Sequence, residues 1–317
     1  MSEAQEARPL VGIVGGGVFG RALVRAASRT GEVVVWSRRA PSFDLPNVRV
    51  STDVAQLVDA ELVLLAVPSR YVSLALDTLG HHLDGGHLLV HVSRGLLDDE
   101  LRTLSAPMRS LTPCRRVGAL AGPVSADLLD AGTPGAGVVG SEFPEVVEAV
   151  RAAIGGPTLR IYASSDLRGV ELAAALTGIL LFTIGVAKRV GFGPGTIGAL
   201  ATRGVAEVSR IGEALGAKPE TFHGLACFGD LIAAVGGSQR PEMILGDAIA
   251  GGASSEDALA QAGGSVEGIE VAHRVAAFCE RRGINAPLIT AVSALVSGRL
   301  DTATAVRKLM GRQLKRE

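Results

Sequence analysis

The feature that most constrains this chain is a short apolar stretch that runs directly into three spaced glycines. Residues 10–14 have the pattern of a buried strand, and Gly15, Gly17 and Gly20 follow in the G-x-G-x-x-G spacing. An amphipathic helical pattern comes next, and then a second apolar strand at 32–36. In this setting the first glycine permits the tight turn, the second lets the backbone approach a pyrophosphate, and the third lets the helix pack on the strand. The pattern predicts a dinucleotide-binding βαβ unit, the alternative being an ordinary glycine-rich turn.

Length and composition indicate a folded protein of two domains. The 317 residues are 47% hydrophobic and 20% charged, and the net charge of −1 favours neither nucleic acid nor an anionic membrane surface. The first nine residues lack the apolar run of a secretory signal. The longest uncharged apolar stretch, 172–187, is short for a membrane span, so we expect a buried helix there. Three scattered cysteines predict free thiols, a cytoplasmic location and no metal site.

From residue 10 to about 162, short apolar strands alternate with helical stretches. This alternation predicts right-handed crossovers and a mostly parallel, doubly wound α/β sheet of the Rossmann type, with its ligand beyond the carboxyl ends of the strands. The expected strands are 10–14, 32–36, 48–50, 62–66, 87–91, 117–121, 136–139 and 159–161.

From about residue 164 the strand pattern disappears and Ala/Leu/Gly-rich helical runs follow. We therefore expect a dinucleotide-binding domain over 1–163 and an all-helical substrate domain over 164–317. Start signals at Pro219 and Ser254 and a stop signal at 251–252 mark three helix boundaries. The expected helices are 166–190, 196–215, 222–234, 240–250, 255–262, 268–281, 285–296 and 301–310.

A second nucleotide signal stands at the end of the second expected strand. An NAD-specific site usually has Asp or Glu there for the ribose 2′-hydroxyl, whereas this chain has Ser37 followed by Arg38 and Arg39. Arginines without a repelling carboxylate suit a 2′-phosphate. The pattern favours NADP over NAD, with use of both possible and with a solvated basic turn as the alternative.

Three further loops follow apolar strands with small or bent residues. They are 67–69, which contains Pro68, then 92–95 and 121–123. Each is unremarkable by itself, but in series behind the glycine motif they indicate backbone that approaches a cofactor.

Taken together, these segments make the chain resemble the cytoplasmic NAD(P)-dependent glycerol-3-phosphate dehydrogenases. The resemblance runs nearly from end to end, and its more specific blocks lie in the second half, at 169–172, 191–193, 202–207, 215–222, 229–231 and 266–268. It implies reversible hydride transfer between NAD(P)H and dihydroxyacetone phosphate to give sn-glycerol 3-phosphate, in glycerophospholipid metabolism. It also implies a homodimer.

The chain departs from the family where the family's catalytic lysines stand. The family's Ala-Leu-Lys-Asn is replaced by 175–178, so the acid/base lysine becomes Thr177, whose hydroxyl is a poor proton donor at neutral pH. Lys188 on the same helix lies eleven residues further on, about 16 Å along the axis, too far to substitute directly. A second family lysine becomes Arg94, which keeps its charge but cannot act as an acid.

The phosphate clamp of the family is altered as well. Aligned without gaps, the family's Arg-Asn pair falls on Pro241 and Glu242, and with a small gap it falls on Gln239 and Arg240. In either case Arg240 is the cation that survives, and we take it as a substrate-binding candidate.

The candidate site residues follow from these matches. Thr177, Asp230, Arg94 and Arg240 are the catalytic or substrate-orienting candidates. The cofactor candidates are Gly15, Gly17, Val18, Phe19, Gly20, Ser37, Arg38, Arg39, Pro68, Arg94, Ala126 and Glu267, the last with a helix-start carboxylate as its alternative. Glu171, Arg203 and His223 remain as further polar candidates, although His223 fits an ordinary residue at a helix start.

The lost lysines leave other functions open beside the first. One is a divergent enzyme acting on another carbonyl or an imine, and another is a non-catalytic protein that binds NADP(H). All three interpretations share a small-molecule ligand and exclude nucleic acid and membrane as partners.

Overall fold

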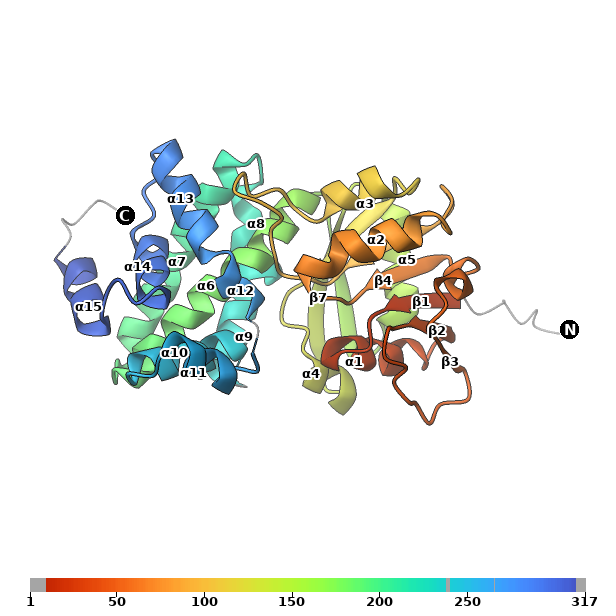
Figure 1. Ribbon diagram of the computed structural model, residues 1–317, viewed down its shortest axis with the longest axis horizontal. Helices are drawn as coiled ribbons and strands as arrows, with labels where there is room; N and C mark the ends of the chain where they lie inside the picture. The colour runs from red at the N-terminus through yellow and green to blue at the C-terminus, as the bar shows by residue number, and fades with distance from the viewer. Residues whose placement is uncertain (1–9, 238–239, 265, 312–317) are drawn as a thin grey trace, which may run out of the picture. The chain divides into compact units, whose positions relative to one another are not determined.

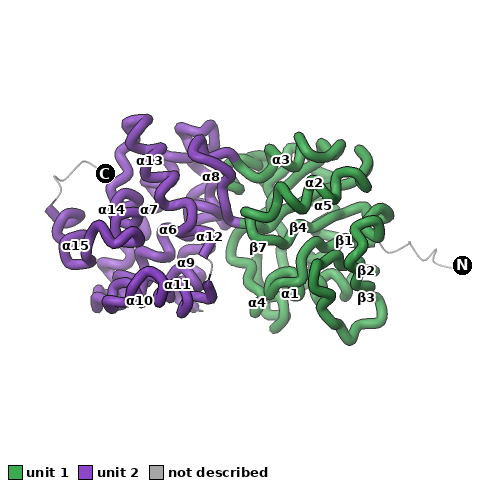
Figure 2. Tube along the Cα trace, viewed as in Figure 1, with its two compact units in different colours: residues 1–93, 103–171 green, residues 94–102, 172–317 purple. Residues whose placement is uncertain are grey.

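The computed structural model describes residues 10–237, 240–264 and 266–311. Contacts divide the chain into two units (Figure 2): unit 1 comprises the described residues of 1–93 and 103–171, and unit 2 those of 94–102 and 172–317. The domain boundary that the sequence places at 163/164 stays a prediction. The sequence carries no signal that the loop 94–102 belongs with unit 2.

Unit 1 is built on an eight-stranded sheet of order β3-β2-β1-β4-β5-β6-β7-β8 (Figure 1). Neighbouring strands are parallel except β6 and β7, which pair antiparallel. The strands lie where the sequence predicts them: β1 (Leu10–Val14), β2 (Glu32–Trp36), β3 (Val48–Ser51), β4 (Leu62–Leu65), β5 (Leu88–His91), β6 (Val117–Ala121), β7 (Gly135–Ser141) and β8 (Leu159–Ser164). The Rossmann-type prediction is confirmed.

Helices cover both faces of this sheet. On one face lie α1 (Val18–Ala27), α4 (Ala126–Ala131) and α5 (Pro144–Ile154), packed on strand residues such as Ile13 and Val90, which are fully buried. On the other face α2 (Val72–Gly80) packs against α3 (Ser105–Leu111) (Figure 1). The 3₁₀ turns η1 (Val54–Leu57) and η2 (Ser69–Tyr71) precede α2. Each fully buried aliphatic side chain of this core stabilises the fold by roughly 1.5–3 kcal/mol relative to an exposed one.

The strand order reverses between β1 and β4. From β1 the chain proceeds outward to β2 and β3, and after returning to β4 it proceeds in the opposite direction. The carboxyl ends of β1, β2 and β4 therefore meet at the point where doubly wound sheets bind ligands.

The described elements of unit 2 are helices, as the sequence predicts. After α6 (Leu167–Arg189), whose first turns belong to unit 1, come α7 (Pro194–Ala214), α8 (Pro219–His223), the π-helical turn η3 (Leu225–Gly229), α9 (Asp230–Gly236), α10 (Pro241–Ala250), α11 (Ser255–Gln261), α12 (Glu267–Glu270), α13 (Ala272–Arg282), α14 (Pro287–Val296) and α15 (Thr302–Met310).

Two of the expected helices are wrong as single elements. The stretch 222–234 is divided among α8, η3 and α9, because Gly224 takes an extended conformation (φ −88°, ψ −164°) that ends α8. The stretch 268–281 is divided between α12 and α13 at Val271. Apolar periodicity did not reveal either break.

Helix α6 is the buried axis of unit 2. It is the one described helix that is long and apolar enough to cross a membrane, yet 94% of its most apolar window is buried inside the protein, as expected for a core helix. A Cβ atom at Gly185 would lie 2.1 Å from the carbonyl oxygen of Met243, and one at Gly246 would lie 2.2 Å from that of Phe182. The backbones of α6 and α10 are therefore in direct contact, which fixes the start of α10 against α6.

A buried carboxylate fixes the start of another helix in unit 2. Glu207 of α7 is 3% exposed and accepts hydrogen bonds from the backbone N–H groups of Leu288 (3.1 Å) and Ile289 (2.8 Å) in the first turn of α14. It satisfies N–H groups that have no partner within α14.

We expect Glu207→Gln to lower the free energy of unfolding by roughly 1.5–3 kcal/mol, because the amide loses the charge that strengthens these two bonds. Urea denaturation followed by circular dichroism measures the effect. Glu213→Gln, at an exposed position of the same helix, is the matched control and should change stability by less than about 0.5 kcal/mol. Equal effects of the two substitutions would contradict the capping role.

Candidate functional site

The glycine motif forms the turn between β1 and α1. Gly15 has a φ of +111°, and a Cβ there would lie 2.4 Å from the carbonyl oxygen of Ala66. A Cβ at Gly20 would lie 2.3 Å from the carbonyl oxygen of Gly15, whereas one at Gly17 would meet nothing within 4 Å. Gly15 and Gly20 are thus required by packing, and Gly17 leaves an open approach to the start of α1.

The N-terminus of α1 is suited to an anion. Gly17 is its N-cap, no side chain caps its first N–H groups, and its first turn contains no acidic residue. Unsatisfied N–H groups and the helix dipole attract negative charge at such an end. These residues fit the pyrophosphate of a dinucleotide, and the exposed Val18 (79%) lies in the same turn.

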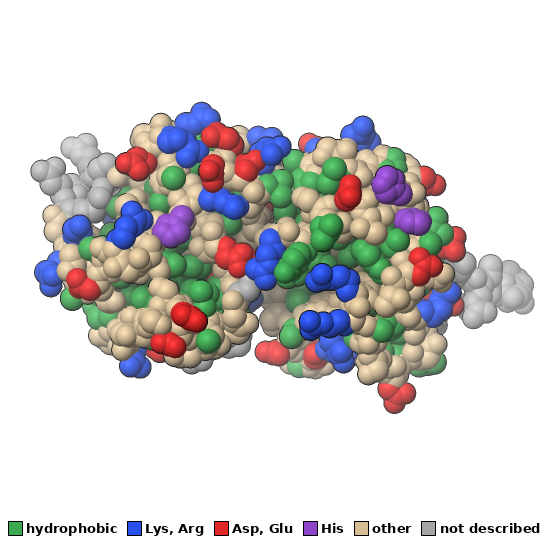
Figure 3. Space-filling view, viewed as in Figure 1, with side chains coloured by type: hydrophobic (Ala, Val, Ile, Leu, Met, Phe, Trp, Pro, Cys, Tyr) green, Lys and Arg blue, Asp and Glu red, His purple; other side chains and the backbone are tan. Residues whose placement is uncertain are grey.

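A pocket of about 620 Å³ opens beside this turn in unit 1, within the range of small-molecule sites. Its lining comes from the ends of β1, β2 and β4 and from α2, and Figure 3 shows Arg side chains beside apolar ones over the side of unit 1 between α1 and α2. The structure brings together here the predicted cofactor residues Gly15, Gly17, Ser37, Arg38, Arg39 and Pro68.

Tyr71 of η2 is a lining residue that the sequence analysis does not identify. The guanidinium carbon of Arg38 lies 5.3 Å from the centre of its ring, and that of Arg70 lies 5.0 Å from it. Both distances are typical of cation–π contacts. The available signal is an aromatic residue soon after the expected strand 62–66, but only the turn η2 shows that it reaches Arg38.

The other predicted cofactor residues lie elsewhere. Val18, Phe19 and Gly20 form the first turn of α1, next to the pocket lining, and Ala126 begins α4, half-buried against the core of unit 1. Arg94 and Glu267 belong to unit 2. Their contacts with a cofactor stay predictions.

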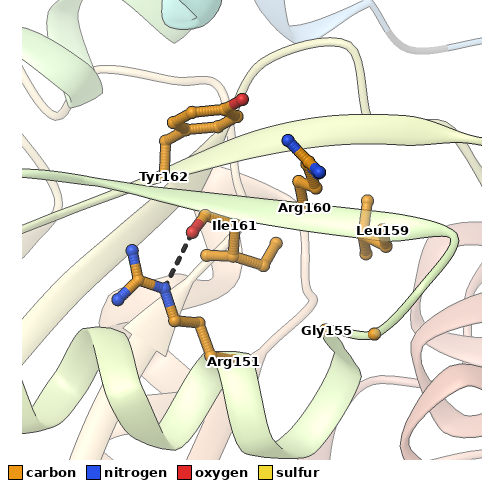
Figure 4. A pocket seen from close by; sticks show the side chains of 7 residues that line it. Arg151, Gly155, Leu159, Arg160, Ile161 and Tyr162 are labelled. Atoms are coloured by element: carbon orange, nitrogen blue, oxygen red, sulfur yellow. Dashed lines mark hydrogen bonds between the residues drawn. The ribbon is translucent and has the colours of Figure 1, made fainter.

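Another hollow, of about 360 Å³, lies at the edge strand β8 of unit 1 (Figure 4). Its Arg151 is already engaged, because Nε donates to the carbonyl oxygen of Ile161 (2.8 Å) and Nη1 to Glu148 (2.6 Å). None of the predicted site residues lines this hollow.

In unit 2 a buried carboxylate joins two arginines. Asp230, the first residue of α9, is fully buried. Its Oδ2 accepts a hydrogen bond from Arg94 Nη1 (2.7 Å), and its Oδ1 accepts one from Arg240 Nη2 (2.5 Å). The two arginine side chains are 19% and 17% exposed. The structure thus brings three of the four predicted catalytic residues into one ion cluster.

Arg94 is also tied to α12, since its backbone N–H donates to Oε2 of Glu267 (3.1 Å). Burial acts to lower the pKa of Arg94, but the negative charges of Asp230, Glu242 and Glu267 outweigh it and raise that pKa. Arg94 is therefore a permanent cation in this centre and cannot serve as a proton donor.

Thr177, the fourth predicted catalytic residue, lies in the core of unit 2. Its side chain is fully buried, and its hydroxyl donates to the carbonyl oxygen of Ala173 (2.7 Å) within α6. The Thr177 hydroxyl also shares a hydrogen bond with the thiol of Cys227, which acts to lower the pKa of that thiol. Burial has the larger effect and raises the pKa of Cys227 to about 12. A hydroxyl engaged in this way is not presented to a substrate, so the geometry weighs against Thr177 as the proton donor.

Other polar candidates have structural positions. Glu171 is buried beside His91 Nε2 (3.0 Å) and accepts hydrogen bonds from Ser105. Burial would raise the pKa of Glu171, but His91 and Ser105 lower it overall, so the carboxylate anchors the start of α6. His223 is exposed at the end of α8, not at a helix start as expected. Among residues 10–237, 240–264 and 266–311, no three His, Cys, Asp or Glu side chains gather as a metal ion would need.

Comparison with known proteins agrees with this organisation. Residues 40–147 match the family model for the N-terminus of NAD-dependent glycerol-3-phosphate dehydrogenase, and residues 166–307 match the model for its C-terminus. Glycerol-3-phosphate dehydrogenases [NAD(P)+] of Azorhizobium caulinodans and Caulobacter vibrioides are 33% and 30% identical, over 97% of this chain and 98% of each relative. The crystal structure of glycerol-3-phosphate dehydrogenase from Coxiella burnetii superposes with a TM-score of 0.88 at 25% identity, covering 96% of this chain and 99% of that one.

The two glycines of the turn should respond differently to substitution. We expect Gly15→Ala to destabilise the protein by more than about 1 kcal/mol, because the new methyl group would enter a left-handed position against Ala66. Gly17→Ala should leave thermal stability nearly unchanged while weakening the binding of a nicotinamide dinucleotide at least tenfold, because its methyl group would occupy the open approach. Thermal denaturation and fluorescence titration measure the two effects. Undiminished dinucleotide binding by Gly17→Ala would contradict the assignment.

Proposed function

The chain belongs to the NAD-dependent glycerol-3-phosphate dehydrogenase family, and from that premise we propose that it interconverts dihydroxyacetone phosphate and sn-glycerol 3-phosphate with NADP(H). The observation that best supports the choice of cofactor is the open N-terminus of α1 at Gly17 beside the basic pair Arg38 and Arg39. We further propose, from the resemblance, a cytoplasmic homodimer, whose assembly light scattering would measure.

The nicotinamide cofactor, when bound, supplies the hydride that reduces the carbonyl carbon. The turn at Gly15 and Gly17 would hold its pyrophosphate. In unit 2, Arg94 and Arg240 supply guanidinium groups of the kind that bind phosphate by paired, charge-assisted hydrogen bonds. Asp230 fixes both of them in position by accepting one N–H from each.

The preference for NADP over NAD rests on the loop after β2. Ser37 is uncharged, so no carboxylate at this position repels a 2′-phosphate, and Arg38 and Arg39 follow it in the pocket lining. Arg38 is held over the ring of Tyr71, which places its charge at the pocket rather than in bulk solvent.

Replacing both arginines should remove most of this preference. We expect the double variant Arg38→Ala and Arg39→Ala to lose roughly ten- to hundredfold in NADPH affinity, the equivalent of one strong charge-assisted hydrogen bond, while NADH affinity changes little. Titration of intrinsic fluorescence with each cofactor measures both constants. Arg49→Ala, an exposed position on β3 outside the pocket, serves as the control. Equal losses for NADPH and NADH would contradict a 2′-phosphate contact.

The reaction itself is tested by NADPH oxidation with dihydroxyacetone phosphate, alongside cofactor binding on the same sample. We expect turnover that depends on both compounds. Binding without turnover would contradict the proposed substrate and favour another carbonyl or an imine, or a non-catalytic NADP(H)-binding protein, because Thr177 stands buried where the family has its acid/base lysine. An absence of cofactor binding would contradict the proposal as a whole.

A further inference from the structure

The proposed reaction needs a side chain that exchanges a proton with the substrate oxygen, and the centre of unit 2 offers few. The guanidinium groups of Arg94 and Arg240 do not deprotonate in proteins. The Thr177 hydroxyl is buried and engaged within α6, and the thiol of Cys227 has a pKa of about 12. Each oxygen of Asp230 already accepts a guanidinium N–H. None of these five groups is suited to accept and return a proton near neutral pH.

Glu242 is a carboxylate of the same centre that takes part in none of these hydrogen bonds. It lies in the first turn of α10 and is 8% exposed, yet its oxygens accept no hydrogen bond from the described part of the chain. Glu267, by comparison, accepts the backbone N–H of Arg94. Among the described residues, the buried side-chain atom that lacks a hydrogen-bond partner is Nδ1 of His91 and not an oxygen of Glu242, so the Glu242 oxygens keep some contact with solvent.

Glycine contacts determine where the Glu242 carboxylate lies. A Cβ at Gly178 would be 2.5 Å from the Cα of Gly268, so the backbones of α6 and α12 touch. A Cβ on either glycine would lie 3.4 Å from Oε1 of Glu242. Because Gly178 directly follows Thr177, the carboxylate stands beside the backbone from which the resembling family projects its Lys-Asn pair.

The charged groups around Glu242 come from several elements. Arg94 of the loop 94–102 interacts with its charge, and Arg240 stands two residues before it at the start of α10. Asp230 of α9 and Glu267 of α12 contribute negative charge through the same cluster. The N-terminus of α10 adds positive potential. These groups place the Glu242 carboxylate within the charged centre that Arg94 and Asp230 form.

We propose that Glu242 is the general acid–base catalyst of this protein, an inference that rests on the proposed function. In the oxidation direction its carboxylate takes the proton of the substrate's secondary hydroxyl as the carbinol carbon transfers hydride to NADP⁺ and the carbonyl bond forms. In the reduction direction the carboxylic acid gives that proton to the carbonyl oxygen as the carbon accepts hydride from NADPH. The proton is then exchanged with solvent.

The test compares Glu242→Gln with the wild-type protein in both reaction directions. We expect kcat to fall at least hundredfold, the usual range for loss of a general base, while NADPH affinity and thermal stability stay close to wild type. Glu280→Gln, an exposed position on α13, is the matched control and should retain full kcat. Retention of kcat by Glu242→Gln to within threefold would overturn the proposal.

The pH profile separates proton transfer from a structural role. In the oxidation direction, wild-type kcat should fall on the acid side as one carboxylate is protonated, and the residual activity of Glu242→Gln should lack that limb. An acid limb that persists unchanged in Glu242→Gln would overturn the proposal. If Glu242→Gln does not fold, the Glu242→Asp variant is used instead. A kcat at least tenfold below that of the wild type, with the acid limb of the pH profile retained, would support the proposal. A kcat equal to that of the wild type would contradict it.

The failure of this inference is distinguishable from failure of the proposed function. A wild-type protein that binds NADPH but does not oxidise it with dihydroxyacetone phosphate contradicts the function itself. A wild-type protein that turns over, with a Glu242→Gln variant equally active, contradicts only the role of Glu242.

Discussion

The centre of unit 2 depends on the buried carboxylate of Asp230. A charge with no solvent exposure is tolerated only when counter-charges and hydrogen bonds compensate it, and Arg94 and Arg240 provide both. Through these contacts one carboxylate ties together the loop 94–102, the start of α9 and the approach to α10. It also holds two guanidinium groups in fixed positions, which is what recognition of an anionic substrate requires.

Close glycine contacts supply the second constraint, and they act alike in both units. In unit 1, Gly15 and Gly20 bring the β1–α1 turn against Ala66, so that the open N-terminus of α1 faces the pocket. In unit 2, Gly178 and Gly268 bring α6 against α12, with Glu242 beside them. In each case the missing side chain lets two backbones touch, and these contacts determine where the start of α1 and the Glu242 carboxylate lie.

Local patterns predicted most of the fold, because each strand of unit 1 is a short apolar run between turn signals and needs no distant residue to be recognised. The turn between β1 and α1 was predictable for the same reason, since the tight conformation at Gly15 follows from the glycine spacing. Local patterns could not predict the break at Gly224, which depends on backbone conformation. They also could not predict that the loop 94–102 belongs to unit 2, because that depends on tertiary contacts.

The same limit applies to the candidate site. Sequence comparison located Asp230 and Arg240 without showing that they bond to one another, and it marked Glu242 only as an altered position. Tyr71 was missed because its contact with Arg38 joins two separate loops. Thr177 was selected by alignment with a lysine, but its burial within α6 could not be read from that alignment.

The central claim is that this chain carries out its proton chemistry without the lysine of its family, through a carboxylate in unit 2. A crystal structure of the protein with NADP⁺ and sn-glycerol 3-phosphate bound tests this claim most directly. The account predicts the secondary hydroxyl of the substrate within hydrogen-bond distance, about 2.5–3.0 Å, of a Glu242 oxygen. A substrate hydroxyl bonded to another side chain, with Glu242 out of reach, would contradict it.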